Sequence, residues 1–134
     1  MGTLIDTSVW IDAFHSRTPR AIKRVAAGAI NRADALLCEP VHLEFFRGVP
    51  DRELTRAQRF LGTVPMLPTP ASLWRDALAI LRTCEKKGAA ISTLDALIAV
   101  IASAHNATIA TFDQDFLILQ KHCDVSVELL PRPA

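Results

Sequence analysis

The sequence predicts an α/β fold in which a short, mostly parallel central sheet is flanked by helices. Short apolar runs, typical of buried strands, alternate along the chain with longer segments of helical pattern. Serine, threonine, proline or glycine stands at most ends of the helical segments, where these residues commonly start or stop a helix. Such alternation is typical of parallel sheets, because parallel strands must be joined by a crossover.

The N-terminal half is expected to contain two strands and four helices. The strands are the apolar runs 3–6 and 35–38. The helices are 8–14, capped by Ser8; 18–31, opened by Thr18 and Pro19; 40–47, ended by Gly48; and 51–61.

The C-terminal half is expected to begin with an extended connection, because TVPMLPTP at 63–70 is rich in proline. Three helices and two strands follow. They are helix 71–87, ended by Gly88; a helix from Ser92 or Thr93 to 104; strand 108–111; a short helix over FLILQK; and strand 125–129.

Composition limits the classes of protein that fit. The chain has 134 residues, of which 50% are hydrophobic and 22% charged, so we expect one globular domain over 1–134 and no disorder. A net charge of +1 implies no global attraction to nucleic acid or membrane. With no leader or membrane-length apolar run in the sequence, and cysteines that are odd in number and far apart, we expect a cytoplasmic protein with reduced thiols.

Four acidic residues stand in apolar sequence at or after the predicted strands. Asp6 ends the first strand, and Asp113 follows the third. Glu44 lies one turn into the helix after the second strand, and Asp95 lies in the first turn of a very apolar helix. Sites in open parallel sheets form outside the carboxyl ends of the strands. We therefore expect the four carboxylates to lie near one edge of the sheet.

Taken singly, each acid also has a structural explanation. Asp6 and Asp113 could be turn residues, and Glu44 could form an ion pair with Arg47. Asp95 could be a first-turn acid stabilised by the helix dipole, with a capping serine three residues before it.

Taken together, the four carboxylates would repel one another and raise one another's pKa. A bound divalent cation removes that conflict. Carboxylate oxygens, with no histidine or thiol among them, are ligands that suit Mg²⁺ or Mn²⁺.

Three stretches of the chain resemble a known family. They are LIDTSVWIDAF near the N-terminus, EFFRG at 44–48, and LDALIAVIASAHNATIATFDQDF at 94–116. In order and spacing they resemble a PIN-domain protein, and more specifically the VapC-type toxin of a bacterial toxin–antitoxin pair. The resemblance spans nearly the whole chain, although 48–90 fits only as generic helices. It implies a three-layer sandwich, a metal-dependent ribonuclease, inhibition by a small antitoxin protein, and a homodimer.

The resemblance also implies which residues form the site. The family's acidic positions fall on Asp6, Glu44, Asp95 and Asp113, as catalytic and metal-binding residues. The implied reaction is hydrolysis of RNA phosphodiester bonds, in which Mg²⁺ or Mn²⁺ orients and acidifies the attacking water and neutralises charge on the phosphate. The sequence does not decide whether the site binds one metal ion or two.

Four further positions are expected to assist. The family's hydroxyl partner matches Ser8 or Thr7, and its strand-end threonine matches Thr111. Asp115 would approach the metal if the third strand stayed extended, but it also precedes a short helix that it could cap. We expect Asp115 mainly to cap that helix, while Asp113 faces the metal.

Two rows of arginine offer contacts to RNA phosphates, to solvent or to an acidic antitoxin segment. They are Arg17, Arg20 and Arg24, and Arg52, Arg56 and Arg59, each row on one helical face.

Two alternative functions stay open at this point. A haloacid-dehalogenase-like phosphatase also uses an aspartate after its first strand, but it needs a second aspartate where this chain has Ser8. A catalytically silent protein that keeps the PIN-like fold for binding is the other.

Overall fold

A four-stranded sheet runs through the middle of the computed structural model, which describes residues 2–134. Its strands lie in the order β2-β1-β3-β4, and every neighbouring pair is parallel. The expected sheet is therefore confirmed and is parallel throughout. The strands are β1 (Thr3–Ile5), β2 (Ala35–Leu36), β3 (Thr108–Thr111) and β4 (Ser126–Leu129).

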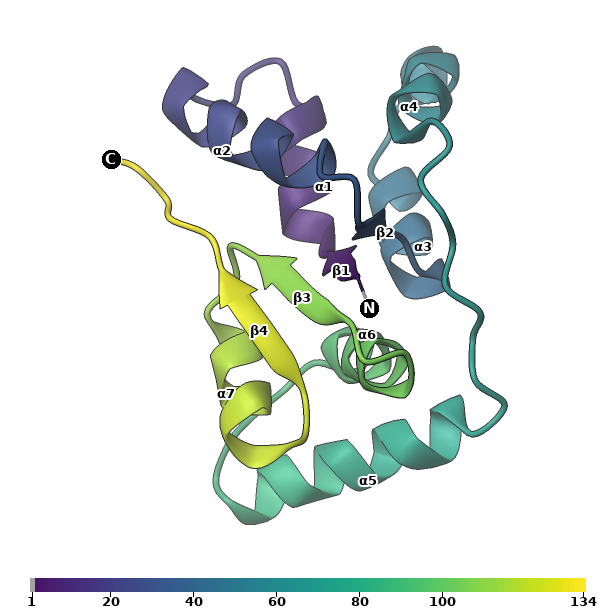
Figure 1. Ribbon diagram of the computed structural model, residues 1–134, viewed down its shortest axis with the longest axis vertical. Helices are drawn as coiled ribbons and strands as arrows, with labels where there is room; N and C mark the ends of the chain where they lie inside the picture. The colour runs from purple at the N-terminus through teal and green to yellow at the C-terminus, as the bar shows by residue number, and fades with distance from the viewer. Residues whose placement is uncertain (1) are drawn as a thin grey trace.

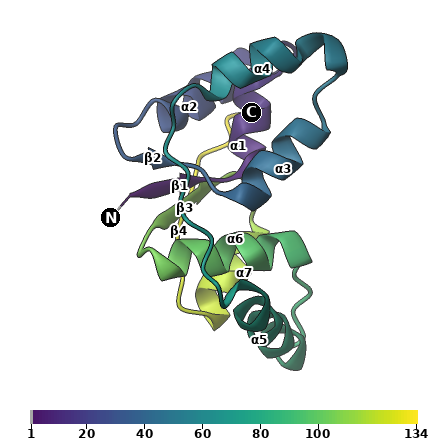
Figure 2. The same ribbon diagram turned by 90° about the vertical axis from the view of Figure 1, so that its right-hand side faces the viewer.

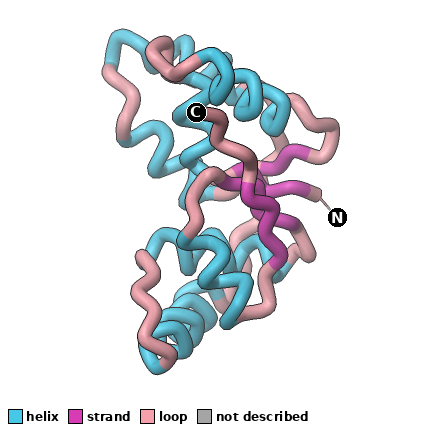
Figure 3. The backbone as a smooth tube through the Cα atoms, turned by 90° about the vertical axis from the view of Figure 1, so that its left-hand side faces the viewer, coloured by secondary structure: helices cyan, strands magenta, loops and turns pink. Residues whose placement is uncertain are grey.

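Helices cover both faces of this sheet, so the molecule has three layers (Figures 1 and 2). One layer contains α1 (Thr7–Phe14), α2 (Arg20–Ile30), α3 (Glu39–Arg47) and α4 (Leu54–Leu61). The other contains α5 (Leu73–Lys86), α6 (Thr93–Ala104) and α7 (Asp115–His122). Figure 3 shows the strands between the two groups of helices. The predicted three-layer α/β architecture is confirmed.

The core is most apolar around α6, which packs against both β3 and α5. A helix enclosed in this way needs apolar side chains nearly all round. Accordingly, every residue from 96 to 102 is buried, while Leu94 at the start of the helix is half-buried. On the other face, the aromatic side chains of Trp10, Phe14 and Phe45 are buried where α1 packs against α3 and α4.

Several predicted boundaries differ from the structure, as at α2, α4 and β2. Helix α2 begins at Arg20, so Pro19 stands at its N-cap and not inside it. The helix expected over 51–61 begins as a short 3-10 turn, Asp51–Glu53, before α4. Strand β2 ends at Leu36, because Leu37 leaves it to bridge the extended connection at Met66.

Two further observations bear on the sequence-based expectations. Within residues 2–134, no helix is long and apolar enough to cross a bilayer. The three cysteines are free thiols, as expected: Cys38, Cys84 and Cys123.

Candidate active site

Asp6 is fixed at the carboxyl end of β1, next to β3. Its backbone N–H donates to the carbonyl oxygen of Ala110 over 3.0 Å, so the residue continues the pairing of the two strands. Its side chain lies where the sheet meets the start of α1, and the residue is only 4% exposed. Burial raises the pKa of the Asp6 carboxyl above its ordinary value, and nearby hydrogen-bond donors partly offset that rise.

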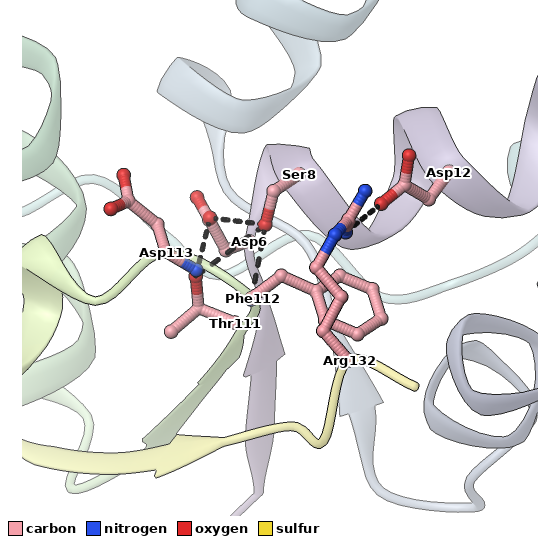
Figure 4. Close-up of polar contacts among 7 residues, drawn as sticks. All are labelled: Asp6, Ser8, Asp12, Thr111, Phe112, Asp113 and Arg132. Carbon is pink, nitrogen blue, oxygen red and sulfur yellow. Dashed lines mark hydrogen bonds and ion pairs between the residues drawn. The ribbon is translucent and has the colours of Figure 1, made fainter. Parts of the chain in front are cut away.

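Two hydroxyl groups hold the Asp6 carboxylate (Figure 4). Its Oδ2 accepts hydrogen bonds from Ser8 Oγ over 2.9 Å and from Thr111 Oγ1 over 2.8 Å. The same hydroxyls accept backbone N–H groups from the chain beyond β3, Ser8 from Phe112 over 3.2 Å and Thr111 from Asp113 over 2.9 Å. This network ties the end of β1, the start of α1 and the turn after β3 together.

The hydroxyl partner of Asp6 is therefore Ser8 and not Thr7. The Thr7 hydroxyl is buried and has no hydrogen-bond partner among residues 2–134. The prediction that Ser8 caps the first helix is wrong. Helix α1 begins at Thr7, and Asp6 occupies its N-cap without a side-chain capping bond. Ser8 lies inside the first turn, where its hydroxyl can reach back to Asp6.

Three acids form a tighter cluster beside Asp6. One carboxylate oxygen each from Asp95, Asp113 and Asp115 lies within 4.8 Å of the others. Asp95 is placed by the start of α6, where its backbone N–H donates to Ser92 Oγ over 3.1 Å, so the predicted cap is confirmed. Within the described part of the chain, this cluster does not include Asp6 or Glu44.

Of the roles predicted for Asp113 and Asp115, the capping of α7 by Asp115 is wrong. Gln114 occupies the N-cap of α7, and Asp115 is the first helical residue and makes no capping bond. Instead, the Asp113 carboxylate accepts the backbone N–H of Asp115 over 2.9 Å. The chain turns directly after β3, so Asp113 stabilises the local turn and leaves the exposed carboxylate of Asp115 in the acidic cluster.

Electrostatics connects this cluster with the other two acids. Burial raises the pKa of Asp95 to about 7, and the charges of Asp6, Asp113 and Glu44 add to the rise. Glu44 is half-buried on α3, and no ion pair with Arg47 is found in residues 2–134. The structure thus brings all four predicted acids into one region of negative charge.

The donor set of this region fits a hard divalent cation. Every side chain is a carboxylate, and oxygens of three of them lie within 4.8 Å of one another, close enough to repel. Asp6 has only one oxygen committed to the hydroxyl groups, so its Oδ1 is free of those bonds. Oxygen ligands of this kind suit Mg²⁺ or Mn²⁺.

The predicted arginine rows are distributed differently. Arg17 lies in the loop before α2, so it does not share a helical face with Arg20 and Arg24. It instead joins Arg52 and Arg56 around a hollow of about 640 Å³.

Aromatic and aliphatic side chains form much of this hollow, including Ile11, Phe14, Phe45 and Val49. The guanidinium carbon of Arg56 lies 3.8 Å from the centroid of the Phe14 ring. None of the predicted acids lines the hollow, so it is separate from the acidic cluster.

One group of residues near the site was missed from the sequence. Arg132, in the C-terminal tail, donates from Nη1 to Asp12 Oδ2 over 2.7 Å, and its guanidinium carbon lies 5.2 Å from the centroid of the Phe112 ring (Figure 4). No local sequence signal joins Arg132 to Asp12, because the two residues are 120 positions apart.

The sequence of the chain matches a known family and known relatives. The PIN domain family matches residues 3–121. Ribonuclease VapC11 of Mycobacterium tuberculosis is 31% identical over 127 residues, covering 88% of this chain and 91% of the relative. VapC ribonuclease Mb1587 of Mycobacterium bovis matches with the same identity and coverage.

Two solved structures show the same fold at low sequence identity. VapBC2 from Rickettsia felis, bound to a DNA fragment from its promoter, gives a TM-score of 0.75 at 19% identity, covering 98% of this chain and all of that one (100%). VapBC-1 from nontypeable Haemophilus influenzae gives a TM-score of 0.73 at 18% identity, covering 96% of this chain and 98% of that one.

Proposed function

Because the chain belongs to the PIN-domain family and is a relative of the VapC ribonucleases, we propose that it hydrolyses RNA phosphodiester bonds with Mg²⁺ or Mn²⁺. The observation that carries the proposal is the cluster of Asp95, Asp113 and Asp115 beside the buried carboxylate of Asp6. An aspartate-based phosphatase of the haloacid-dehalogenase type is excluded by the family match.

Each acid has a role that follows from its surroundings. Asp6, held by two hydroxyls, would be a fixed metal-binding carboxylate. Asp95 and Asp113 would supply further metal-binding oxygens from α6 and the turn after β3, and Asp115 would add an exposed one. Glu44 adds negative charge from α3. A bound divalent ion would acidify the attacking water and neutralise charge on the scissile phosphate.

The hydroxyl groups of Ser8 and Thr111 position these carboxylates. Each accepts a backbone N–H from the turn after β3 while donating to Asp6. They therefore fix the distance between the end of β1 and the residues that follow β3. Ser8 and Thr111 do not need to touch the substrate to affect the rate.

The proposal is tested by RNA cleavage with purified protein. We expect cleavage with Mg²⁺ or Mn²⁺ and none in EDTA. A phosphate monoester, which a phosphatase would hydrolyse, should stay intact under the same conditions. Full RNA cleavage in EDTA, with zinc and calcium also excluded, would contradict the metal requirement. Binding of RNA without cleavage under any metal would instead support a catalytically silent binding protein.

We also propose that a small antitoxin protein binds this chain and inhibits it in the cytoplasm, where RNA is available and thiols stay reduced. Similar structures from Rickettsia felis and Haemophilus influenzae are VapBC assemblies. The hollow between α1, α3 and α4 offers the partner apolar side chains beside Arg17, Arg52 and Arg56. A segment with apolar and acidic side chains would complement it.

Bacterial expression tests the partner. We expect expression of this chain alone to arrest growth, and co-expression of the cognate partner to restore growth and give a complex that purifies together. Harmless expression of a soluble chain that cleaves RNA in vitro would contradict the toxin role.

Two finer proposals concern surfaces away from the acids. Of the predicted row, Arg20 and Arg24 remain together on α2 and would contact RNA phosphates, and charge reversal at Arg24 should weaken RNA binding. A homodimer is supported by Trp74 and Leu78, which lie one turn apart on α5 and are 71% and 56% exposed. Light scattering of Trp74→Glu against the parent chain tests the dimer, since a monomeric parent would contradict it.

A further inference from the structure

The C-terminal tail presents one arginine beside the acidic site. The tail leaves β4 at Leu130, which is buried and whose backbone N–H donates to Thr111 O over 2.8 Å. Arg132 then stands between Pro131 and Pro133. Each proline fixes its own φ, and a residue that precedes proline is restricted to extended backbone. The arginine is therefore carried on a stiff segment that is anchored at the end of β3.

Two contacts hold the Arg132 guanidinium in place. It donates to Asp12 Oδ2 over 2.7 Å, and its central carbon lies 5.2 Å from the centroid of the Phe112 ring, within the range of a cation–π contact. Both contacted residues lie near Ser8. Asp12 lies one turn after Ser8 on α1, and Phe112 donates its backbone N–H to Ser8 Oγ. The arginine thus lies next to the network that holds Asp6 (Figure 4).

The guanidinium keeps donors free for a ligand. Its side chain is 52% exposed although it is held on two sides, and the side chain of Asp12 is 20% exposed. A guanidinium has five N–H donors, and only Nη1 is used in the bond to Asp12. A planar group with free donors and fixed orientation is well suited to a phosphate.

The negative charge of the site disfavours RNA binding, and the positive charge of Arg132 would counter this. RNA is a polyanion, and the carboxylates of Asp95, Asp113 and Asp115 would repel it. A positive charge fixed one residue away from Asp113, over the ring of Phe112, would offset that repulsion for a neighbouring nucleotide. The half-buried ring of Phe112 thus has a cation beside it, which is a positioning contact for the arginine.

We infer that Arg132 is a substrate-binding residue, which holds a phosphate of the RNA strand next to the scissile one. Asp12 and Phe112 are the residues that position it. The inference rests on the proposed ribonuclease function and adds a specific contact to the substrate.

The test compares Arg132→Gln with a matched control, Arg82→Gln, which removes an exposed arginine from α5. We expect Arg132→Gln to raise KM for RNA about fivefold, the size of one exposed charge contact, while kcat stays within about twofold. The salt dependence of binding should become shallower by about 0.7 in log–log slope, which corresponds to one lost phosphate contact on a single strand. The control should change none of these values.

Two further variants sharpen the result. Arg132→Lys keeps the charge but loses the planar fork, so its KM should lie between those of the parent and Arg132→Gln. Asp12→Asn removes the negative partner while leaving the arginine, so it should raise KM less than Arg132→Gln does. Melting temperatures of all variants should match that of the parent, because the pair is at the surface.

Binding of a fluorescent oligoribonucleotide in EDTA is measured in parallel, so the inference is tested even if the parent chain does not cleave RNA. Unchanged KM and unchanged RNA binding in Arg132→Gln would overturn the inference and leave the ribonuclease function standing. A lower kcat at unchanged KM would overturn it as well, because the arginine would then act through the acids. Unchanged RNA binding with weaker binding of the partner protein would assign Arg132 to a protein interface.

Discussion

The two sides of the acidic site are built in different ways. On one side, the Asp6 carboxylate is buried and receives hydrogen bonds from Ser8 and Thr111. On the other side, the hydroxyl of Ser92 only partly offsets the raised pKa of Asp95, Asp113 accepts only a backbone N–H, and no side-chain donor to the Asp115 carboxylate is found within residues 2–134. The first side is held by the protein itself, whereas the second consists of carboxylates that face one another.

This difference separates what the fold provides from what a cation must provide. The hydroxyl groups orient Asp6 before any ligand arrives, and they lower part of the cost of burying its charge. At Asp95 the hydroxyl of Ser92 offsets only part of the effect of burial and neighbouring charges, so the rest is balanced by protonation or by a metal. We therefore expect substitutions on the two sides to affect activity and stability in different proportions.

The largest effect on activity is expected from Asp6→Asn. The variant should lose RNA cleavage by about 100-fold or more, because removal of a ligand should cost at least as much as removal of a group that supports one. Its melting temperature in EDTA should equal or exceed that of the parent. An amide oxygen can still accept both hydroxyl hydrogen bonds, and a buried charge that burial disfavours is removed.

The matched control for Asp6→Asn is Glu85→Gln, which neutralises an exposed acid on α5. It should change neither cleavage nor melting. If Asp6→Asn cleaves RNA at the rate of the parent, Asp6 is a structural residue and the metal site lies wholly in the other three acids.

A smaller loss of activity is expected from the positioning hydroxyls. Ser8→Ala and Thr111→Val should each reduce cleavage by about 10- to 100-fold, as the loss of groups that orient a ligand commonly does. Unlike Asp6→Asn, both should also destabilise the protein by about 1–3 kcal/mol, since each leaves a backbone N–H and part of a buried carboxylate without a partner. Denaturant unfolding in EDTA and initial cleavage rates measure the two effects. Full stability in both variants would show that water replaces the hydroxyls.

The pH dependence of stability should come mainly from the cluster of Asp95, Asp113 and Asp115. Burial and neighbouring charges raise the pKa of Asp95 to about 7, above its ordinary value near 4. Between these values the folded, metal-free protein binds more protons than the unfolded chain, so stability falls as pH rises through this window. In EDTA, Asp95→Asn should therefore melt close to the parent at pH 5 and above it at pH 8.

Magnesium should reverse that order at pH 8, because the ion stabilises the charged carboxylates of the parent and the variant has lost one of them. Thermal melts at both pH values, with EDTA and with Mg²⁺, are the measurement. If the parent and Asp95→Asn differ by the same amount at pH 5 and pH 8, Asp95 does not titrate in this range.

Much of the fold was predictable because its signals are local. The buried strand that ends at Thr111 and the helix that Ser92 caps were both correctly predicted, since apolar patterns and capping residues act over a few positions. The gathering of Asp6, Glu44 and Asp95 could also be anticipated, because parallel strands bring their carboxyl ends to one edge.

The errors arose where a side chain had two possible partners. Ser8 is a good capping residue, but its hydroxyl bonds to the Asp6 carboxylate and a backbone N–H from the turn after β3, 104 positions away in sequence. The contact between Arg132 and Asp12 spans 120 positions, so no local pattern contains it. Tertiary contacts of this kind depend on how the tail and α1 are placed, which the sequence alone does not reveal.

The smallest effect is expected on stability, from substitutions at Asp113 and Asp115, for which the predicted helix cap was wrong. Asp113→Ala removes the acceptor for the backbone N–H of Asp115, and it should cost about 1 kcal/mol of stability in EDTA, as lost capping bonds commonly do. Asp115→Ala removes no hydrogen bond, and its cost should stay within about 0.5 kcal/mol. Each variant removes one charge from the same cluster, but only Asp113 is among the charges that raise the pKa of Asp95, so relief of repulsion is larger in Asp113→Ala and the difference is a lower limit for the hydrogen bond. Asp113→Asn serves as the control, because its side-chain oxygen can still accept that N–H while being a poorer ligand for a hard cation. It should keep the stability of the parent and lose RNA cleavage.

Denaturant unfolding of the three variants measures the comparison. A cost for Asp115→Ala as large as that for Asp113→Ala would mean that Asp115 does cap α7, as the sequence suggested.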